Sequence, residues 1–408
     1  MIKWLPFILC IFHVATTLAQ PVSGTITNAD GKPVSGVHVF CLGKNVGEVS
    51  DKNGHYNINT DGCDYVVFRH LHFKQKVISS EILKKTPDII LEDTVFFINA
   101  VDIYSKPVIA LLPDTPIFVY DYEICKDRII MCAFFQRKLN QPILLYSDLN
   151  GNIIDSKTLS ETGNLYQDPE GTIYLTQKNY AYQLIIENNK IMFSDAFEAK
   201  HVTSAKQHWT HSVGDSIILR YYYFKNQGVG YFIKHLSNDS IKLFLEFVDE
   251  DAYDRMKWGS YFDGCEFDKR FEELIVYKPI QIPIFFRKND IVAFNFVTWK
   301  IQYFGFDGNF ISEIDMQFGD QKKIKHEIYF DNVLNKYYGR EIRNGLNSLI
   351  ELDVSTGKMV KYFSFKGYPH IEKLNVSDGV LYFIYKDYSG DEYKRLYKSP
   401  LINMVAGR

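Results

Sequence analysis

The sequence has no excess of charge of either sign. Its 408 residues include 46 Lys and Arg against 49 Asp and Glu, which gives a formal net charge of -3. A nucleic-acid-binding protein usually carries a basic patch or stripe, and the sequence has none. We therefore expect that nucleic acid is not a partner. With 46% hydrophobic residues, the chain is long enough to bury more than one core.

The local motifs of the common enzyme classes are also missing. The sequence contains no HExxH, no CxxC pair, no GxSxG elbow and no phosphate-binding loop. Two histidine pairs, His70 with His72 and His208 with His211, lack a third metal ligand. We predict no metal and no other cofactor, and we favour a protein that is not an enzyme. A hydrolase or lyase that acts on glycans through scattered carboxylates stays open as the alternative.

Long apolar runs are absent beyond the first 20 residues. Residues 1–20 have Lys3, an apolar run over 4–12 and small residues before a plausible cleavage site, which is the pattern of a signal peptide. The run is too short to span a bilayer. Cys10 lacks the small preceding residue of a bacterial lipoprotein site. We expect an exported protein without a lipid anchor or a transmembrane segment, located in the periplasm, at the outer membrane or outside the cell.

Cysteine is scarce, and five cysteines remain after residue 20. An odd number cannot form a complete disulfide framework. Cys41 with Cys63 would bridge the first module, and Cys125 with Cys132 flank a turn. Buried unpaired thiols fit the sequence equally well. The fifth residue is Cys265.

Phe and Tyr are abundant, with 31 and 28 residues against 4 Trp. Aromatic side chains suit pleated, half-buried strand surfaces better than helices. We therefore predict an all-β protein with a small N-terminal β-sandwich and a larger second part.

The first module shows short alternating runs and one strong turn signal. Val37, Val39 and Cys41 alternate as the inward face of a strand. In GEVSDKNGHYNI, residues 47–58, the turn residues 51–54 separate two alternating runs and predict a β-hairpin.

Residues 21–97 resemble the carboxypeptidase regulatory-like domain through VSGTI at 22–26, GKPVSGVHV at 31–39 and GEVSDKNGHY at 47–56. The pair His72-Phe73 stands where the family usually has Gly-Tyr. The resemblance implies a transthyretin-like β-sandwich of the kind found ahead of many envelope proteins of the Bacteroidota.

Residues 113–408 contain a repeat that becomes visible when the turns are aligned. Most turns recur about every 45 residues, a period typical of four-stranded propeller blades. One set precedes strong strands: 126–128, 168–171, 214–216, 288–290, 335–336 and 377–379. A second set leads to shorter strands: 150–152, 188–189, 238–239, 307–309 and 356–357.

These turns predict a six-bladed β-propeller, and the region loosely resembles the six-bladed propellers of Bacteroidota envelope proteins. One longer interval predicts an insertion at about 249–278. The sixth repeat lacks an outer strand, which residues 401–406 or 98–108 would supply. Residues 98–112 are accordingly a linker or a ring-closing strand.

Candidate binding residues follow from this architecture. Propellers bind ligands through the loops between blades and the loops joining the second and third strands of each blade. The insertion offers aromatic and acidic side chains there, and a lid packed on the ring or on the first module is the structural alternative. We predict a non-catalytic binding or assembly module of the cell envelope that recognises a protein or glycan. Its candidate residues are Trp258, Tyr261, Asp263, Trp299, Arg137 and Arg343.

Overall fold

A computed structural model describes ten ranges of the chain: 21–44, 46–92, 108–113, 115–136, 138–224, 226–259, 278–318, 323–365, 367–386 and 393–401. Their contacts divide the protein into two units, residues 1–97 and 98–408. Strands and antiparallel sheets dominate both units, so the prediction of an all-β protein is confirmed.

The described residues of the first unit form two small sheets and one short helix. One sheet has the order β4-β1-β7, and the other has the order β3-β2-β5-β6. The bounds are β1 Val22–Asn28, β2 His38–Cys41, β3 Gly47–Val49, β4 His55–Ile58, β5 Tyr65–His70, β6 Phe73–Ser79, helix α1 Ser80–Lys85 and β7 Ile89–Leu91.

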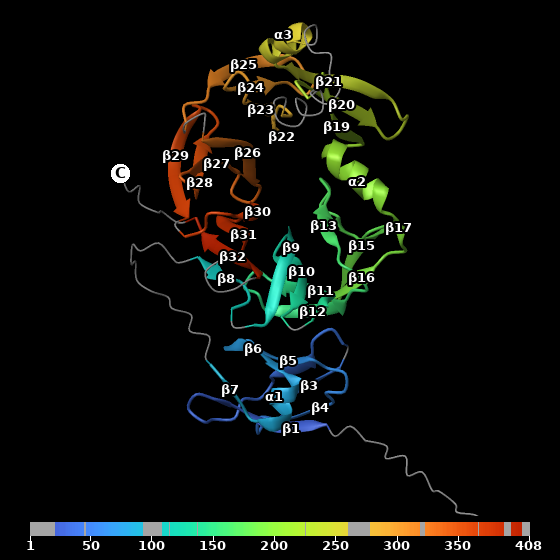
Figure 1. Cartoon of the computed structure of the whole chain (residues 1–408), viewed down its shortest axis with the longest axis vertical. Coiled ribbons are helices and arrows are strands. Elements are labelled where there is room, and N and C mark those ends of the chain that lie inside the picture. Colours follow the sequence, from blue (N-terminus) through green and yellow to red (C-terminus); the bar gives the residue numbers. More distant parts are fainter. Residues whose placement is uncertain are drawn as a thin grey trace, which may run out of the picture. The chain divides into compact units, whose positions relative to one another are not determined.

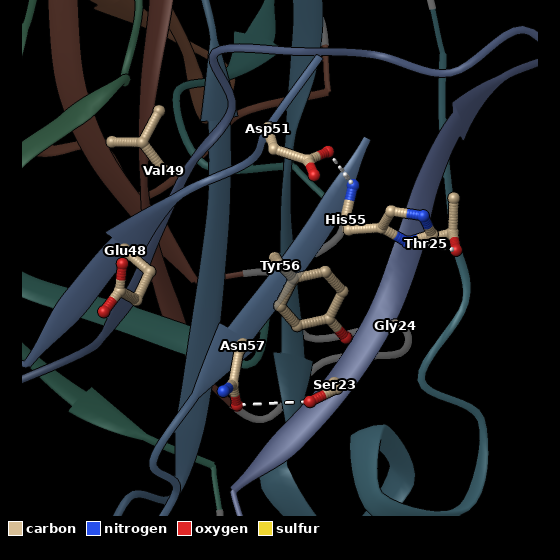
Figure 2. A pocket seen from close by; sticks show the side chains of 9 residues that line it. All are labelled: Ser23, Gly24, Thr25, Glu48, Val49, Asp51, His55, Tyr56 and Asn57. Carbon is tan, nitrogen blue, oxygen red and sulfur yellow. Dashed lines mark hydrogen bonds between the residues drawn. The ribbon is translucent and has the colours of Figure 1, made fainter. Parts of the chain in front are cut away.

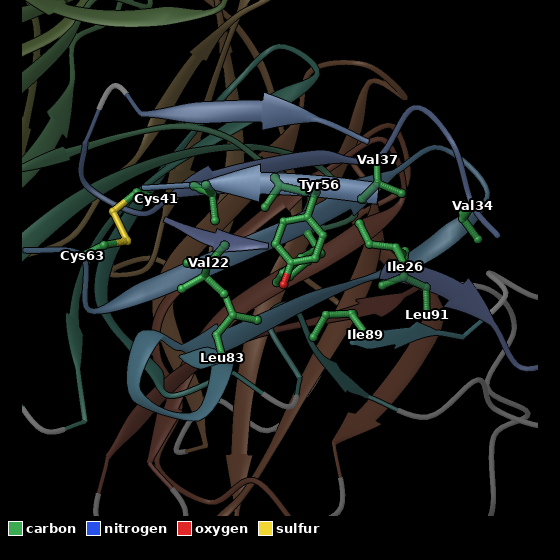
Figure 3. Packing of buried hydrophobic residues seen from close by; sticks show 14 residues of the cluster. Val22, Ile26, Val34, Val37, Cys41, Tyr56, Cys63, Leu83, Ile89 and Leu91 are labelled. Atoms are coloured by element: carbon green, nitrogen blue, oxygen red, sulfur yellow. A yellow bond between two sulfur atoms is a disulfide. The ribbon is translucent and has the colours of Figure 1, made fainter. Parts of the chain in front are cut away.

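Both sheets contribute side chains to one core, as Figure 3 shows. Ile26 from the first sheet and Val39 from the second are completely buried. A disulfide joins Cys41 to Cys63, with their Cα atoms 5.8 Å apart. The first of the two pairings that the sequence allowed is therefore present. Cys125 and Cys132 are free thiols, and Cys265 lies outside the described residues.

The predicted hairpin around Asp51 is wrong, although its turn is present. Asp51 Oδ1 accepts backbone hydrogen bonds from Asn53 and His55 at 2.8 Å each, and Gly54 has a φ of 75°. The two flanking strands do not pair with each other, because β3 pairs with β2 and β4 pairs with β1. The turn motif is local, whereas the inward side chains decide which strand is the partner. The turn thus joins the two sheets.

In the part of the second unit that the structure describes there are six antiparallel sheets, each built on a path of four strands, and in five of them these four strands follow in chain order (Figure 1). The first three are β9 Ile117–Cys125, β10 Arg128–Phe135, β11 Lys138–Asp148, β12 Ile153–Thr158; then β13 Asn164–Gln167, β14 Ile173–Thr176, β15 Tyr180–Glu187, β16 Lys190–Phe193, with β17 Phe197–Glu198 added beside β15; then β18 Trp209–Val213, β19 Ser216–Tyr223, β20 Gly228–His235, β21 Ile241–Val248.

The last three sheets are β22 Ile284–Phe286, β23 Ile291–Asn295, β24 Lys300–Phe304, β25 Phe310–Asp315; then β26 Ile324–Asp331, β27 Lys336–Arg343, β28 Leu346–Asp353, β29 Lys358–Phe365; then β30 Glu372–Ser377, β31 Val380–Lys386, β32 Lys394–Pro400 and β8 Ile109–Ala110. The sixth sheet thus takes its outer strand from a segment that precedes the first sheet.

Strand β8 joins the two ends of the sheet series. Ala110 pairs with Tyr397, and Ile109 pairs with Lys398. The strand lies within the predicted segment 98–112, one residue beyond the range 98–108 that was expected to supply it. The other expected source, 401–406, lies outside the described residues except for Leu401.

Consecutive sheets share apolar cores. Buried clusters join the first sheet to the second, the third to the fourth, the fourth to the fifth and the fifth to the sixth. Helix α2, Ala199–His208, contacts strands of the second and third sheets. Strand β9 contacts β31 and β32, so the sixth sheet also packs on the first.

Both predicted sets of turns are confirmed. The first set joins the first and second strands of the sheets, as Lys126 does with a φ of 54° between β9 and β10. The second set joins the third and fourth strands, as Gly308 does with a φ of 84°. Helix α3, Glu250–Gly259, follows the third sheet, where the insertion was predicted. Among the described residues, no helix has the length and apolar character needed to cross a membrane.

Candidate functional site

Two of the predicted site residues lie where a second strand connects to a third strand in the described part of the second unit. Trp299 lies between β23 and β24, and Arg343 is the last, exposed residue of β27. Arg137 lies outside the described residues. Trp299 and Arg343 belong to different sheets, the fourth and the fifth.

The predicted residues of the insertion are only partly described. Trp258 belongs to helix α3, but the structure does not describe its side chain. Tyr261 and Asp263 also lie outside the described residues. Their role in binding stays a prediction.

The root of the insertion, in contrast, is well defined. The backbone N–H of Asp249 donates to the carbonyl oxygen of Gln227 at 2.9 Å, and the Gln227 amide donates to the carbonyl oxygen of Lys278 at 3.2 Å. The N–H of Ile280 donates to the carbonyl oxygen of Asn226 at 3.0 Å. Both ends of the segment 249–278 are therefore held by the loop between β19 and β20.

Trp299 has an unusual backbone conformation for a bulky residue, with a φ of 58°. Its indole is partly buried and lies 5.5 Å from the Phe296 ring and 6.1 Å from the Phe318 ring, measured between centroids. Its carbonyl oxygen accepts a hydrogen bond from Met316 at 3.0 Å. The packing holds the loop, while part of the indole stays accessible.

His326 extends this aromatic group and was missed by the sequence analysis. Its imidazole stacks on the Phe296 ring at 4.8 Å with an angle of 4° between the planes, and it lies 6.4 Å from the Trp299 ring. Partial burial and the charge of Lys325 lower the pKa of His326. The sequence around this histidine of strand β26 does not predict an aromatic group, because its aromatic neighbours come from another sheet.

Phe224 repeats the conformation of Trp299 in the neighbouring sheet. It lies in the loop between β19 and β20, has a φ of 51° and is 44% exposed. Its ring packs at 4.8 Å on Tyr223 and at 4.7 Å on Tyr253 of helix α3. We call Phe224, Tyr253, Trp299 and His326 the loop-end aromatics. The third and fourth sheets thus each present an aromatic residue at φ above zero in equivalent loops.

A charged cluster joins strand β9 of the first sheet to strand β30 of the sixth. Lys373 Nζ lies 2.5 Å from Asp121 Oδ1 and 2.8 Å from Glu123 Oε1. The side chain of Lys373 is 32% exposed, and those of Asp121 and Glu123 are 10% and 13% exposed. Asp121 also accepts a hydrogen bond from the backbone N–H of Leu165 at 2.6 Å. One lysine therefore neutralises part of a two-carboxylate group at this junction.

Burial and charge act in opposite directions on this cluster. Burial raises the pKa of Glu123, although Lys373 lowers it. Burial lowers the pKa of Lys373, but the charges of Glu123 and Asp121 outweigh burial, so its pKa is raised. The lysine is held in its charged form. Within the described ranges, no group of three or more His, Cys, Asp or Glu side chains is arranged to hold a metal ion.

The first unit has an open surface pocket of about 570 Å³ (Figure 2). It lies between the edge strands β3 and β4, with Glu48 and Val49 on one side and His55 on the other. Ser23 donates to Asn57 at 3.2 Å. Several of its polar groups are thus already paired with one another, and Asp51 is engaged in the turn.

Comparison with known proteins identifies the first unit. Residues 22–101 match the family of the CarboxypepD_reg-like domain, so the resemblance seen in the sequence motifs is confirmed for that domain. The chain has no significant match among curated proteins. The family match covers all described strands of the first unit, and it leaves the function of the six sheets to be inferred from their own geometry.

Proposed function

We propose that the protein is a non-catalytic binding or assembly module of the bacterial cell envelope that recognises a protein or a glycan. In this proposal the six sheets are the blades of a six-bladed β-propeller that β8 closes, as an outer strand does in rings of this kind. The recognition face consists of the loops between second and third strands together with the connection that carries helix α3.

The conformation of Phe224 and Trp299 carries this proposal. A bulky residue at φ above zero costs on the order of 1–3 kcal/mol, and such strain tends to persist at ligand clamps and other functional sites. Here it occurs in two equivalent loops of neighbouring sheets. Loops on a rigid scaffold are the usual location of binding residues. The insertion begins and ends on the loop of Phe224, which supports a role for its predicted residues at the same face.

The proposed location in the cell envelope rests on separate observations. The leader-like residues 1–20 and the similarity to a domain common in envelope proteins both favour export. The disulfide between Cys41 and Cys63 is typical of proteins outside the reducing cytosol. Mass spectrometry of the mature protein should find an amino terminus near residue 21 without a lipid. A lipidated terminus would contradict the prediction of an exported protein without a lipid anchor.

The recognition face can be tested with two matched double variants. Phe224→Ala with Trp299→Ala removes two loop-end aromatics, while Phe306→Ala with Phe310→Ala removes two aromatics, 49% and 55% exposed, at the opposite end of β24. Binding would be measured on an array of bacterial glycans and against purified envelope proteins captured by crosslinking. Aromatic anchors often contribute over ~2 kcal/mol to binding. The first variant should therefore weaken binding at least tenfold, and the second should not.

A third variant tests the insertion. Trp258→Ala with Tyr261→Ala should abolish binding while the unfolding temperature stays nearly constant. Unchanged binding per folded molecule with a large loss of stability would instead identify the insertion as a packed lid. Equal losses in the loop and control variants would contradict a recognition face at the loop ends.

A further inference from the structure

Arg220 is a partly buried cation that has no carboxylate partner among the residues that the structure describes. It lies in the middle of β19, on the same strand face as Ile218 and Tyr222, which pack in the core shared by the third and fourth sheets. Its guanidinium carbon is 5.3 Å from the centre of the Tyr222 ring. Its Nε atom is shielded from solvent and has no hydrogen-bond partner. Buried charges in proteins are normally paired, so this arrangement requires an explanation.

Two other arginines of the second unit show what is missing. Arg287 lies over the Tyr303 ring at the same distance, 5.3 Å, but its Nε donates to Asp290 at 2.5 Å. Arg395 lies over an aromatic ring as well, and its guanidinium donates to backbone carbonyl oxygens of residues 112 and 115. Among the described residues, Arg220 makes no salt bridge, and its hydrogen-bonding neighbour is the neutral hydroxyl of Tyr231.

The described polar groups near Arg220, the Tyr231 hydroxyl and the His211 imidazole, are uncharged. Tyr231 donates to the carbonyl oxygen of Ile282 at 2.5 Å, which leaves its oxygen free to accept from Arg220. His211 on β18 has a buried Nδ1 without a hydrogen-bond partner. Burial and the charge of Arg220 lower the pKa of His211 to about 4, so its imidazole is neutral near pH 7. The cluster therefore keeps one uncompensated positive charge beside aromatic rings.

We propose that Arg220 anchors a binding site for a carboxylate-bearing ligand between the third and fourth sheets. A guanidinium binds a planar carboxylate through two parallel hydrogen bonds, and a single negative charge balances the single positive charge present. A phosphate dianion would leave one charge without a partner at this location. The Tyr222 ring and the neutral imidazole of His211 are the aromatic groups beside this positive charge. The site goes beyond the proposed recognition face, since it uses none of the loop-end aromatics.

Calorimetric titrations of the full chain test this site with two pairs of probes. D-glucuronate against D-glucose reports an acidic sugar, and the α-amide of N-acetylglutamate against the α-amide of N-acetylglutamine reports the side chain of a peptide. The acids should bind and the neutral partners should not, and the tighter of the two acids identifies the source of the carboxylate. Arg220→Gln should weaken binding at least tenfold, Arg220→Lys should weaken it less, and the matched control Arg287→Gln should leave it unchanged.

A second measurement uses the wild-type chain and does not depend on the folding of a variant. The Nε–H resonance of Arg220 should shift on addition of the acid that binds and stay in place with its neutral partner. Failure of both acids to bind at tens of millimolar would overturn the proposal. Equal affinity of the wild type and Arg220→Gln would overturn it as well. Loss of the loop-end aromatics should leave this binding intact, so the two proposals succeed or fail separately.

Discussion

The Tyr122 hydroxyl lies 2.7 Å from the carbonyl oxygen of Lys373, 251 positions later in the chain, and 2.9 Å from that of Tyr382. The two residues next to Tyr122 bind the side chain of the same lysine. Lys373 has a φ of 35° and lies at an irregularity in the pairing of β30. Such irregularities re-aim side chains, and here the result is that three consecutive residues of β9 hold the first sheet to the sixth.

Lys373→Ala should strongly destabilise the second unit, because it leaves the carboxylates of Asp121 and Glu123 buried without their cation. Breaking a fully buried pair costs about 3–5 kcal/mol, and we expect somewhat less because Lys373 is 32% exposed. Lys394→Ala is the matched control, since its pair with Glu372 is 38% and 51% exposed and should contribute under ~1 kcal/mol. Urea unfolding of both variants gives the comparison. Equal effects would show that the junction is not held by this cluster.

Removal of β8 should open the sheet series. A chain that begins at residue 113 loses the pairing of Ile109 and Ala110 with β32, the hydrogen bond from Leu111 to Leu396 at 2.8 Å, and the buried side chains of Leu111 and Leu112. A chain that begins at residue 105 keeps them. The unfolding temperature of the shorter chain should be several degrees lower. In a domain of 150–250 residues, each kcal/mol of lost stability lowers the unfolding temperature by ~2–4 °C. Calorimetry checks this, and equal unfolding temperatures would contradict closure by β8.

Loss of the disulfide should affect only the first unit. Cys41→Ala with Cys63→Ala removes a crosslink between residues 22 positions apart, which typically contributes about 2–4 kcal/mol. The unfolding transition of the first unit should shift to lower temperature, and that of the second should stay in place. Cys125→Ala, which removes a free and partly exposed thiol, serves as the control. A reducing agent should reproduce the shift in the wild type and leave the double variant unchanged.

Turns and strand faces were predictable from the sequence because their signals are local. The Asp168 turn illustrates this, since Asp168 Oδ1 accepts hydrogen bonds from the N–H groups of Glu170 and Thr172 within its own loop. Regular spacing of such turns was enough to predict six repeats. Strand pairing is a tertiary property, and the Asp51 turn was therefore misread as a hairpin.

The candidate sites were less predictable, for the same physical reason. Trp299 stood out as a tryptophan in a loop, but His326 and Phe296 meet only after two sheets pack together. The positive φ of Phe224 cannot be read from composition, because the neighbouring structure imposes it. Arg220 has no local motif either; its significance lies in the absence of a carboxylate near it in the described structure.

The stability of the protein should fall on acidification in a way that depends on His211. Burial and the charge of Arg220 lower the folded-state pKa of His211 from 6.5 to about 4. Between these values the unfolded chain binds a proton at this position and the folded chain does not. The free energy of unfolding therefore decreases as the pH falls from 6.5 towards 4, by at most ~1.4 kcal/mol per pH unit for one proton.

His211→Phe should flatten this dependence, since Phe fits beside the Phe286 ring that His211 contacts at 4.9 Å. Carboxylates that titrate near pH 4 are common to both proteins, so the difference between the two curves isolates His211. His326→Phe should change the curve less, because that imidazole is more exposed. Urea unfolding at half-unit steps from pH 4 to 7 measures all three. Parallel curves for the wild type and His211→Phe would mean that this imidazole becomes protonated in the folded state as readily as in the unfolded chain.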